Sequence, residues 1–153
     1  MSDLSINIKN ESDREIDETM FESVAALICA SEMPSIRFEI GILICTEELM
    51  RKHNSVYRGV KGTTDILSFV SAQMPLMADG REHIYRLCDL IIDINQIDRQ
   101  KGTNSLNAEL MEVYIHGLLH LCGYDHIRET DRKIMKEKEL HYQNKLRGED
   151  TSG

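Results

Sequence analysis

The chain has 153 residues and a net charge of -8, with 18 lysines and arginines against 26 aspartates and glutamates. Its length fits one domain with its own core, and the acidic balance argues against the broadly basic surface of most nucleic-acid-binding domains. It contains no apolar run near the roughly 20 residues of a membrane span, no basic and apolar leader, and no CxxC pair among its four cysteines. We therefore expect a cytoplasmic protein with reduced cysteines and no membrane contact.

The first third of the chain predicts a strand, a helix and a second strand. Residues 4–8 alternate apolar and polar side chains, which is typical of a half-buried strand. Ser12 and Glu15 have the spacing of a capping box, and apolar residues at helical spacing predict a helix from there to about Ala30. Residues 35–46 are rich in apolar and β-branched side chains, so a second strand follows.

The middle of the chain predicts a short helix and two more strands. Thr46 could cap a helix over residues 47–54, which has two acids in its first turn. Residues 62–70 and 83–94 have strand composition, and the segment between them predicts a loop or a hairpin connection.

The C-terminal part predicts two helices. Apolar spacing indicates a helix over residues 104–122 closed by Gly123, and another over about 129–146. This order of elements predicts an α+β domain with some α/β character, built on a single sheet of about four strands with helices packed on it. We expect one metal-dependent hydrolase domain over residues 1–147, followed by a flexible tail at 148–153.

Three histidines lie close together in the stretch YIHGLLHLCGYDH, which begins at residue 114. His116 and His120 are four residues apart, so in a helix they project from the same face and can meet at one ion. His126 would lie about 9 Å further along the axis if the helix continued. Gly123 can reverse the chain in the left-handed conformation and so bring His126 back. The spacing predicts a metal site at the end of a core helix.

Three neutral imidazoles suit one Zn²⁺ ion per chain, with a fourth tetrahedral position open to water. Such an ion lowers the pKa of water to about 7 and stabilises developing oxyanions, which is the chemistry of hydrolysis. The competing interpretation is that His116 and His120 form a hydrogen-bonded pair on a helix face, with His126 on a loop.

The residue after the first histidine separates two classes of zinc enzyme. Metzincin peptidases share the spacing of the three histidines, but their general base is a glutamate directly after the first one. Here that residue is Gly117. A peptidase would therefore need another base, and the sequence argues against this class.

Two motifs resemble those of the YbeY endoribonuclease family. The stretch HGLLHLCGYDH at 116–126 is similar to the family signature HGxLHLxGYDH, and YRGVKGTTDILSF at 57–69 is similar to its arginine followed by a TDVLSF block. The resemblance extends over approximately residues 40–145. Val70 replaces the proline that often follows the block, and Cys88 replaces the glycine before Asp89, so the geometry near these two positions can differ from the family's.

The resemblance implies a zinc-dependent endoribonuclease that cuts single-stranded RNA in the cytoplasm. It further implies a role in ribosomal RNA processing, notably at the 3′ end of the small-subunit RNA, in ribosome biogenesis and in ribosome quality control. The expected partners are RNA and the ribosome, not DNA or a membrane. The implied zinc ligands are His116, His120 and His126, and the arginine important for activity is Arg58.

The residues around Arg58 are candidates for substrate contacts. A guanidinium can bind two phosphate oxygens at once, so Arg58 is a catalytic candidate together with His116. Lys61 and Ser68 are further substrate-binding candidates, although each can also be a solvated or structural side chain. Asp65 could be a general base, a partner of a ligating histidine, or a turn residue.

Two other functions compete with the nuclease. One is a zinc peptidase or amidohydrolase that uses a different base. The other is a non-catalytic, ribosome-associated factor whose metal is structural, although such sites are closed by four protein ligands.

Overall fold

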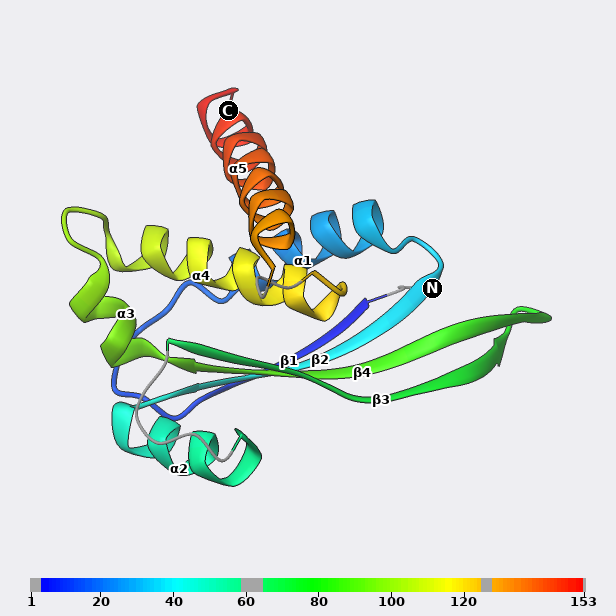
Figure 1. Cartoon of the computed structure of the whole chain (residues 1–153), viewed down its shortest axis with the longest axis horizontal. Helices are drawn as coiled ribbons and strands as arrows, with labels where there is room; N and C mark the ends of the chain where they lie inside the picture. The colour runs from blue at the N-terminus through cyan, green and yellow to red at the C-terminus, as the bar shows by residue number, and fades with distance from the viewer. Residues whose placement is uncertain (1–3, 59–64, 125–127, 153) are drawn as a thin grey trace.

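A computed structural model describes residues 4–58, 65–124 and 128–152 of the chain. Four strands form one sheet, and five helices surround it (Figure 1). In chain order the elements are β1 (Leu4–Asn10), α1 (Thr19–Glu32), β2 (Ile36–Cys45), α2 (Glu47–Arg58), β3 (Ile66–Ala78), β4 (Arg81–Asp93), α3 (Ile94–Gln100), α4 (Leu106–Leu121) and α5 (Glu129–Ser152).

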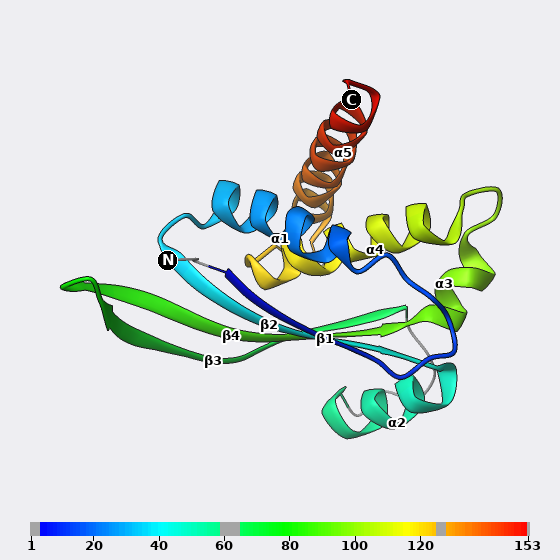
Figure 2. The same cartoon turned by 180° about the vertical axis from the view of Figure 1, so that it is seen from behind.

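The sheet has the strand order β1-β2-β4-β3. The strand β2 pairs in parallel with both β1 and β4, whereas β3 pairs with β4 in the antiparallel sense and forms an edge. Figures 1 and 2 show α1 and α4 on one face, α5 standing against α4, and α2 alone across one end of the other face. This arrangement confirms the predicted α+β class and the single sheet of four strands.

The core lies between the sheet and the pair α1 and α4. Alternate residues of β2, namely Phe38, Ile40, Ile42 and Ile44, are buried together with the apolar faces of these two helices. At about 25 cal/mol per Å² of buried apolar surface, this layer is the main source of stability. It fixes α4, which carries His116 and His120, against the sheet.

The helix α1 begins later than its sequence predicts. Ser12 does not cap it, because the backbone N–H and the hydroxyl of Ser12 both donate to the Asn10 side chain, at 2.9 and 2.6 Å. The helix instead begins at Thr19. The predicted capping box at Ser12 and Glu15 is therefore wrong, because the serine closes a local turn after β1.

The segment between the third and fourth predicted strands is a hairpin. Asp79 and Gly80 have φ angles of 54° and 72°, typical of a two-residue type I′ turn. The strand β4 continues over residues 81–83 beyond its pairing with β2, so the tip of the hairpin projects past β1 and β2 (Figure 1). The helix α3 was not predicted; it begins after Asp93, whose carboxylate accepts from two backbone N–H groups of its first turn.

The last helix is longer than predicted and runs to Ser152, beyond Gly148, where the sequence suggested a tail. One glycine costs a helix only about 1 kcal/mol, so it does not end the helix without a further breaker.

None of the helices within the described part of the chain is long and apolar enough to cross a membrane. All four cysteines are free and buried, and burial raises the pKa of Cys45 and Cys88 to about 12.

Candidate metal centre

Two of the three predicted ligands face one another on α4. The Nε2 atoms of His116 and His120 are 3.1 Å apart, and their rings meet at an interplanar angle of 80°. This proximity follows from their spacing of four residues, which places both side chains on one face of the helix. The predicted pairing is therefore present in the structure.

The end of α4 has the geometry that Gly123 predicts. The backbone N–H of Gly123 donates to the carbonyl oxygen of His120 at 3.0 Å, and the backbone N–H of Tyr124 donates to the carbonyl oxygen of Leu119 at 3.0 Å. Together with the φ angle of 100° at Gly123, these bonds form a Schellman motif. The chain thus turns immediately after His120, as a third ligand at residue 126 requires.

Both histidines are oriented by hydrogen bonds at Nδ1. His116 Nδ1 lies 2.5 Å from a carboxylate oxygen of Glu139, and His120 Nδ1 lies 2.9 Å from the carbonyl oxygen of Tyr124. Since a carbonyl only accepts, His120 carries its proton at Nδ1, and a carboxylate favours the same tautomer for His116. In the neutral rings both Nε2 lone pairs then converge on the same point.

The converging nitrogens fit a zinc ion. The lone pairs of two nitrogen atoms that lie 3.1 Å apart repel each other unless a cation or a proton lies between them. Two nitrogens bound at about 2.0–2.1 Å in a tetrahedron around zinc lie about 3.3 Å apart, close to the observed separation. Among the residues that the structure describes, no group of three or more candidate ligands gathers. The predicted third ligand, His126, lies outside these residues.

The structure gives Gly117 a packing role. A Cβ atom at this position would lie 2.5 Å from Ile66 Cδ1, 3.2 Å from Leu90 Cδ2 and 3.3 Å from Ser68 Oγ. The helix therefore lies so close to β3 and β4 that the position after the first histidine has no room for a glutamate. The close packing therefore excludes a glutamate at residue 117, the position of the general base in metzincin peptidases.

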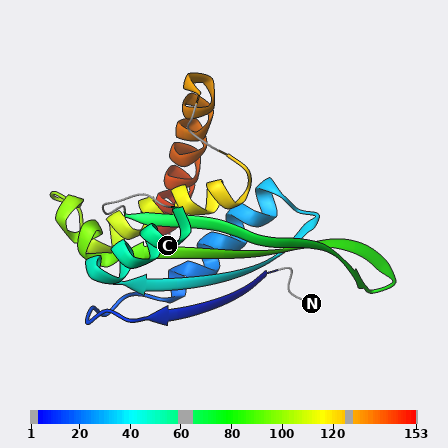
Figure 3. The ribbon, with the colours of Figure 1, turned by 60° about the horizontal axis from the view of Figure 1, so that its bottom comes forward.

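The other predicted site residues lie in different places. Ser68 is half-buried on β3, beneath α4 and beside Gly117, on the same sheet face as the histidines. Arg58 ends α2, which lies on the opposite face (Figure 3), and its side chain is outside the described residues. Lys61 is also outside them. The structure thus brings Ser68 to the histidine face and places the helix of Arg58 behind the sheet.

A carboxylate that the sequence did not single out binds the first histidine. The sequence also allows Asp65 this role, but its carboxylate accepts from the Gln100 side chain at 3.0 Å. Glu139 comes instead from α5, where it lies on the same helical face as the buried Met135 and Tyr142. The position of this acid on the apolar face of an amphipathic helix is the one sequence signal that could have pointed to Glu139.

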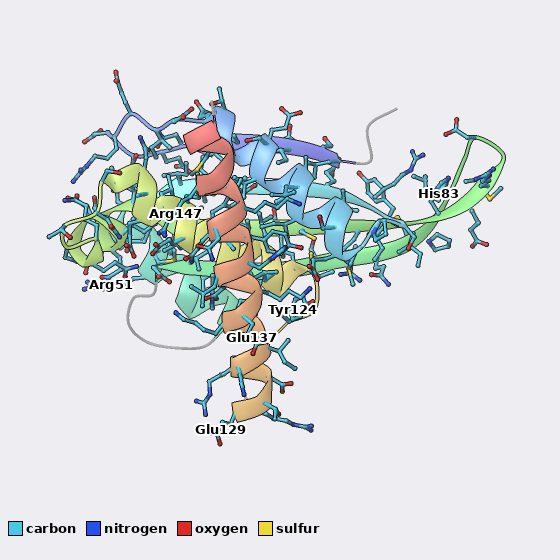
Figure 4. The ribbon with its side chains drawn as sticks, turned by 90° about the horizontal axis from the view of Figure 1, so that it is seen from above. Arg51, His83, Tyr124, Glu129, Glu137 and Arg147 are labelled. Carbon is cyan, nitrogen blue, oxygen red and sulfur yellow. The ribbon has the colours of Figure 1, made fainter. Side chains whose placement is uncertain are left out.

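Neither of the other two histidines whose side chains are described, His83 and His141, joins the pair. His83 lies far out on the β3–β4 hairpin (Figure 4), and the ring of His141 packs edge-on against Tyr142 at 4.9 Å. The side chain of His53 lies outside the described residues. These positions support the choice of His116 and His120 as the relevant pair.

A separate groove lies on the opposite sheet face. It has a volume of about 620 Å³ and is lined in part by Phe69, Leu43 and Asp89. Gly41 leaves room for Asp89, since a Cβ there would lie 2.8 Å from the carboxylate. Burial, and secondarily Glu39, raises the pKa of Asp89. The sheet separates this groove from the histidines, so it does not surround the metal centre.

The Glu139 contact predicts a specific loss of metal affinity. Replacing Glu139 with glutamine keeps the size of the side chain but removes the charge that favours the Nδ1–H tautomer of His116. We expect zinc to bind about 10- to 100-fold more weakly, measured by competition with a chromophoric chelator. Glu137→Gln, at an exposed position on the same helix, is the matched control. Equal losses in the two variants would contradict the role of Glu139.

Comparison with known proteins identifies the family of the chain. A family model described as Endoribonuclease YbeY matches residues 6–147, which is most of the chain. The chain belongs to the YbeY endoribonuclease family. The match extends the resemblance of the two motifs to β1 and α1, which had no specific signal of their own.

Individual YbeY relatives cover most of the chain. The Desulforamulus reducens protein is 35% identical over 122 residues, 78% of this chain and 80% of its own. The Finegoldia magna protein is 36% identical over 140 residues, 88% of each chain. Both are named Endoribonuclease YbeY. A solution structure of a Thermotoga maritima protein has a TM-score of 0.60 and 24% identity over 97% of this chain and 92% of that one, which shows the shared fold.

Proposed function

We propose that the protein is a zinc-dependent endoribonuclease that cleaves single-stranded RNA. The observation that carries the proposal is the pair of Nε2 atoms 3.1 Å apart, with each Nδ1 held by an acceptor. This donor set suits zinc, and the name shared by the YbeY relatives supports RNA as the substrate. The proposed zinc ligands are His116, His120 and His126.

The residues of the chain have separate roles in this proposal. When bound, zinc acts as a Lewis acid that can activate water and stabilise negative charge on a phosphodiester oxygen. His116 and His120 hold the ion, and Glu139 and the Tyr124 carbonyl keep the two rings in the required tautomer. Ser68, which lies on the same sheet face, is proposed to contact the substrate.

Arg58 is proposed to bind phosphate and to support cleavage, with Lys61 as a further contact. Their chemistry suits this role, because a guanidinium binds phosphate oxygens in pairs. Since α2 and α4 lie on opposite faces of the sheet, a bound RNA strand would pass around β3, which is an edge strand next to α4. A flexible single strand can follow such a path, whereas a stiff duplex cannot.

The proposed setting is the bacterial cytoplasm and the ribosome. We infer that the protein acts in ribosomal RNA processing, including the 3′ end of the small-subunit RNA, and in ribosome quality control. The net charge of -8 predicts that the isolated protein binds RNA weakly, and in this proposal the assembled ribosomal particle contributes the specificity. Neither DNA nor a membrane is a proposed partner.

Cleavage of matched single-stranded and duplex RNA tests the proposal. We expect the zinc-loaded protein to cut the single strand at least about tenfold faster, and Arg58→Ala to reduce this rate about 100-fold. Arg147→Ala, which removes an exposed ion pair with Glu112 on α4, is the control. Equal rates in wild type and Arg58→Ala would indicate a contaminant or a different phosphate contact.

The products of this reaction identify the nucleophile. A 2′,3′-cyclic phosphate at the new end shows attack by the ribose 2′-hydroxyl, whereas its absence from the first products indicates attack by water. No cleavage by any preparation would instead favour a non-catalytic, ribosome-associated factor.

A further inference from the structure

A buried carboxylate at the end of α1 connects three parts of the fold. The side chain of Glu32 is 7% exposed and accepts hydrogen bonds from Tyr124 Oη at 2.5 Å, from Lys138 Nζ at 3.2 Å and from Tyr142 Oη. Both its burial and its place at a helix C-terminus disfavour a negative charge. Although burial raises the pKa of Glu32, the bonds from Tyr124, Tyr142 and Lys138 lower it overall. The carboxylate is thus kept charged at a place where charge is costly.

Tyr124 links this cluster to the metal centre. Its hydroxyl donates to Glu32, its backbone N–H donates to Leu119, and its carbonyl oxygen accepts from His120 Nδ1 at 2.9 Å. Three contacts therefore fix one residue, and the carbonyl that orients His120 has little freedom to rotate. The chain then continues to His126, only two residues further on.

The helix α5 holds both histidines through two separate carboxylates. Glu139 contacts His116 directly, while the neighbouring Lys138 and Tyr142 bind Glu32, which in turn holds Tyr124. Figure 4 shows Tyr124 beside α5, in agreement with these contacts. Removing the link at Glu32 would release the carbonyl partner of His120 without touching either histidine.

We propose that Glu32 is a positioning residue for the metal centre, which acts through Tyr124 to fix the ring of His120. The proposal rests on the proposed zinc site. Glu32 touches neither the ion nor the substrate in this account. Its effect is to keep His120 Nε2 aimed at the point where it meets His116 Nε2, because outer partners of ligating histidines set ring orientation and tautomer.

The test compares three variants of the full-length protein in zinc affinity and stability. Zinc affinity is measured by competition with a chromophoric chelator, and stability by urea unfolding of the metal-free protein. We expect Tyr124→Phe and Glu32→Gln to weaken zinc binding about tenfold. Tyr142→Phe removes another hydroxyl from the same carboxylate but leaves the Tyr124 bond, so it is expected to change zinc affinity less than about twofold.

The outcomes separate this inference from the proposed function. Wild-type protein that fails to bind zinc overturns both. Tight zinc binding by wild type, Tyr124→Phe and Glu32→Gln alike overturns the positioning role and leaves the zinc site standing. An equal loss of affinity in Tyr142→Phe and Tyr124→Phe also overturns it, since the effect would then come from the packing of α5. If Glu32→Gln does not fold, the two tyrosine variants still decide.

Discussion

Replacing His116 with alanine is expected to remove tight zinc binding and to lower the rate of single-stranded RNA cleavage by about 100-fold or more. The substitution deletes one of the two Nε2 atoms that converge at 3.1 Å, so a zinc ion loses a ligand that the remaining histidines cannot replace. The measurement is the cleavage rate at saturating zinc, together with the zinc content after gel filtration.

His83→Ala provides the control for this experiment. His83 lies on the distant hairpin, so its loss should leave both zinc content and cleavage rate close to those of wild type. The role of His116 would be contradicted if His116→Ala, freshly purified and folded, retained one zinc per chain and the wild-type rate.

Gly117→Glu is expected to destabilise the fold by more than about 3 kcal/mol, although it recreates the HExxH pattern of zinc peptidases. The new side chain would meet Ile66, Leu90 and Ser68 within the packed layer beneath α4, and its charge would be buried. Gly117→Ala should cost less, about 1 to 2 kcal/mol, because the gain in helix propensity offsets part of the overpacking. Urea unfolding measures both free energies.

A second substitution tests whether steric contact is the cause. Ile66→Val removes the Cδ1 atom, which would lie 2.5 Å from a Cβ atom at residue 117. Gly117→Ala should therefore be less destabilising in the Ile66→Val background than in wild type, by about 0.5 kcal/mol or more in a double-mutant cycle. Strict additivity would show that the glycine is needed for another reason.

The sequence predicted the elements whose signals are local. The alternation in β1 and the helical spacing in α4 both gave the correct structure, and Gly123 gave the correct helix end. The helix α3 was missed because Asp93 follows an apolar run that suits a buried strand, and its capping role is visible only in its bonds to the next turn. The predicted start of α1 was wrong because the Ser12 hydroxyl donates to the preceding Asn10 side chain and does not cap the helix.

In the candidate site, too, the features with a local sequence signal were predicted and the contacts between distant elements were not. The pairing of His116 and His120 follows from helical geometry, so their spacing of four residues was enough to predict it. Glu139 is 23 residues from its histidine, and their contact exists only because α5 packs against α4. Packing also explains Gly117, whose neighbours come from β3 and β4. Sequence spacing therefore predicts ligands on one helix but not the partners that other helices supply.

The most direct test of the zinc-dependent nuclease is metal removal and replacement. The protein is stripped with a chelator, its residual metal is measured by elemental analysis, and cleavage of a single-stranded RNA is followed as zinc is added back. We predict no cleavage by the metal-free protein and full recovery at one zinc per chain. Undiminished cleavage by protein shown to contain no metal would contradict the account.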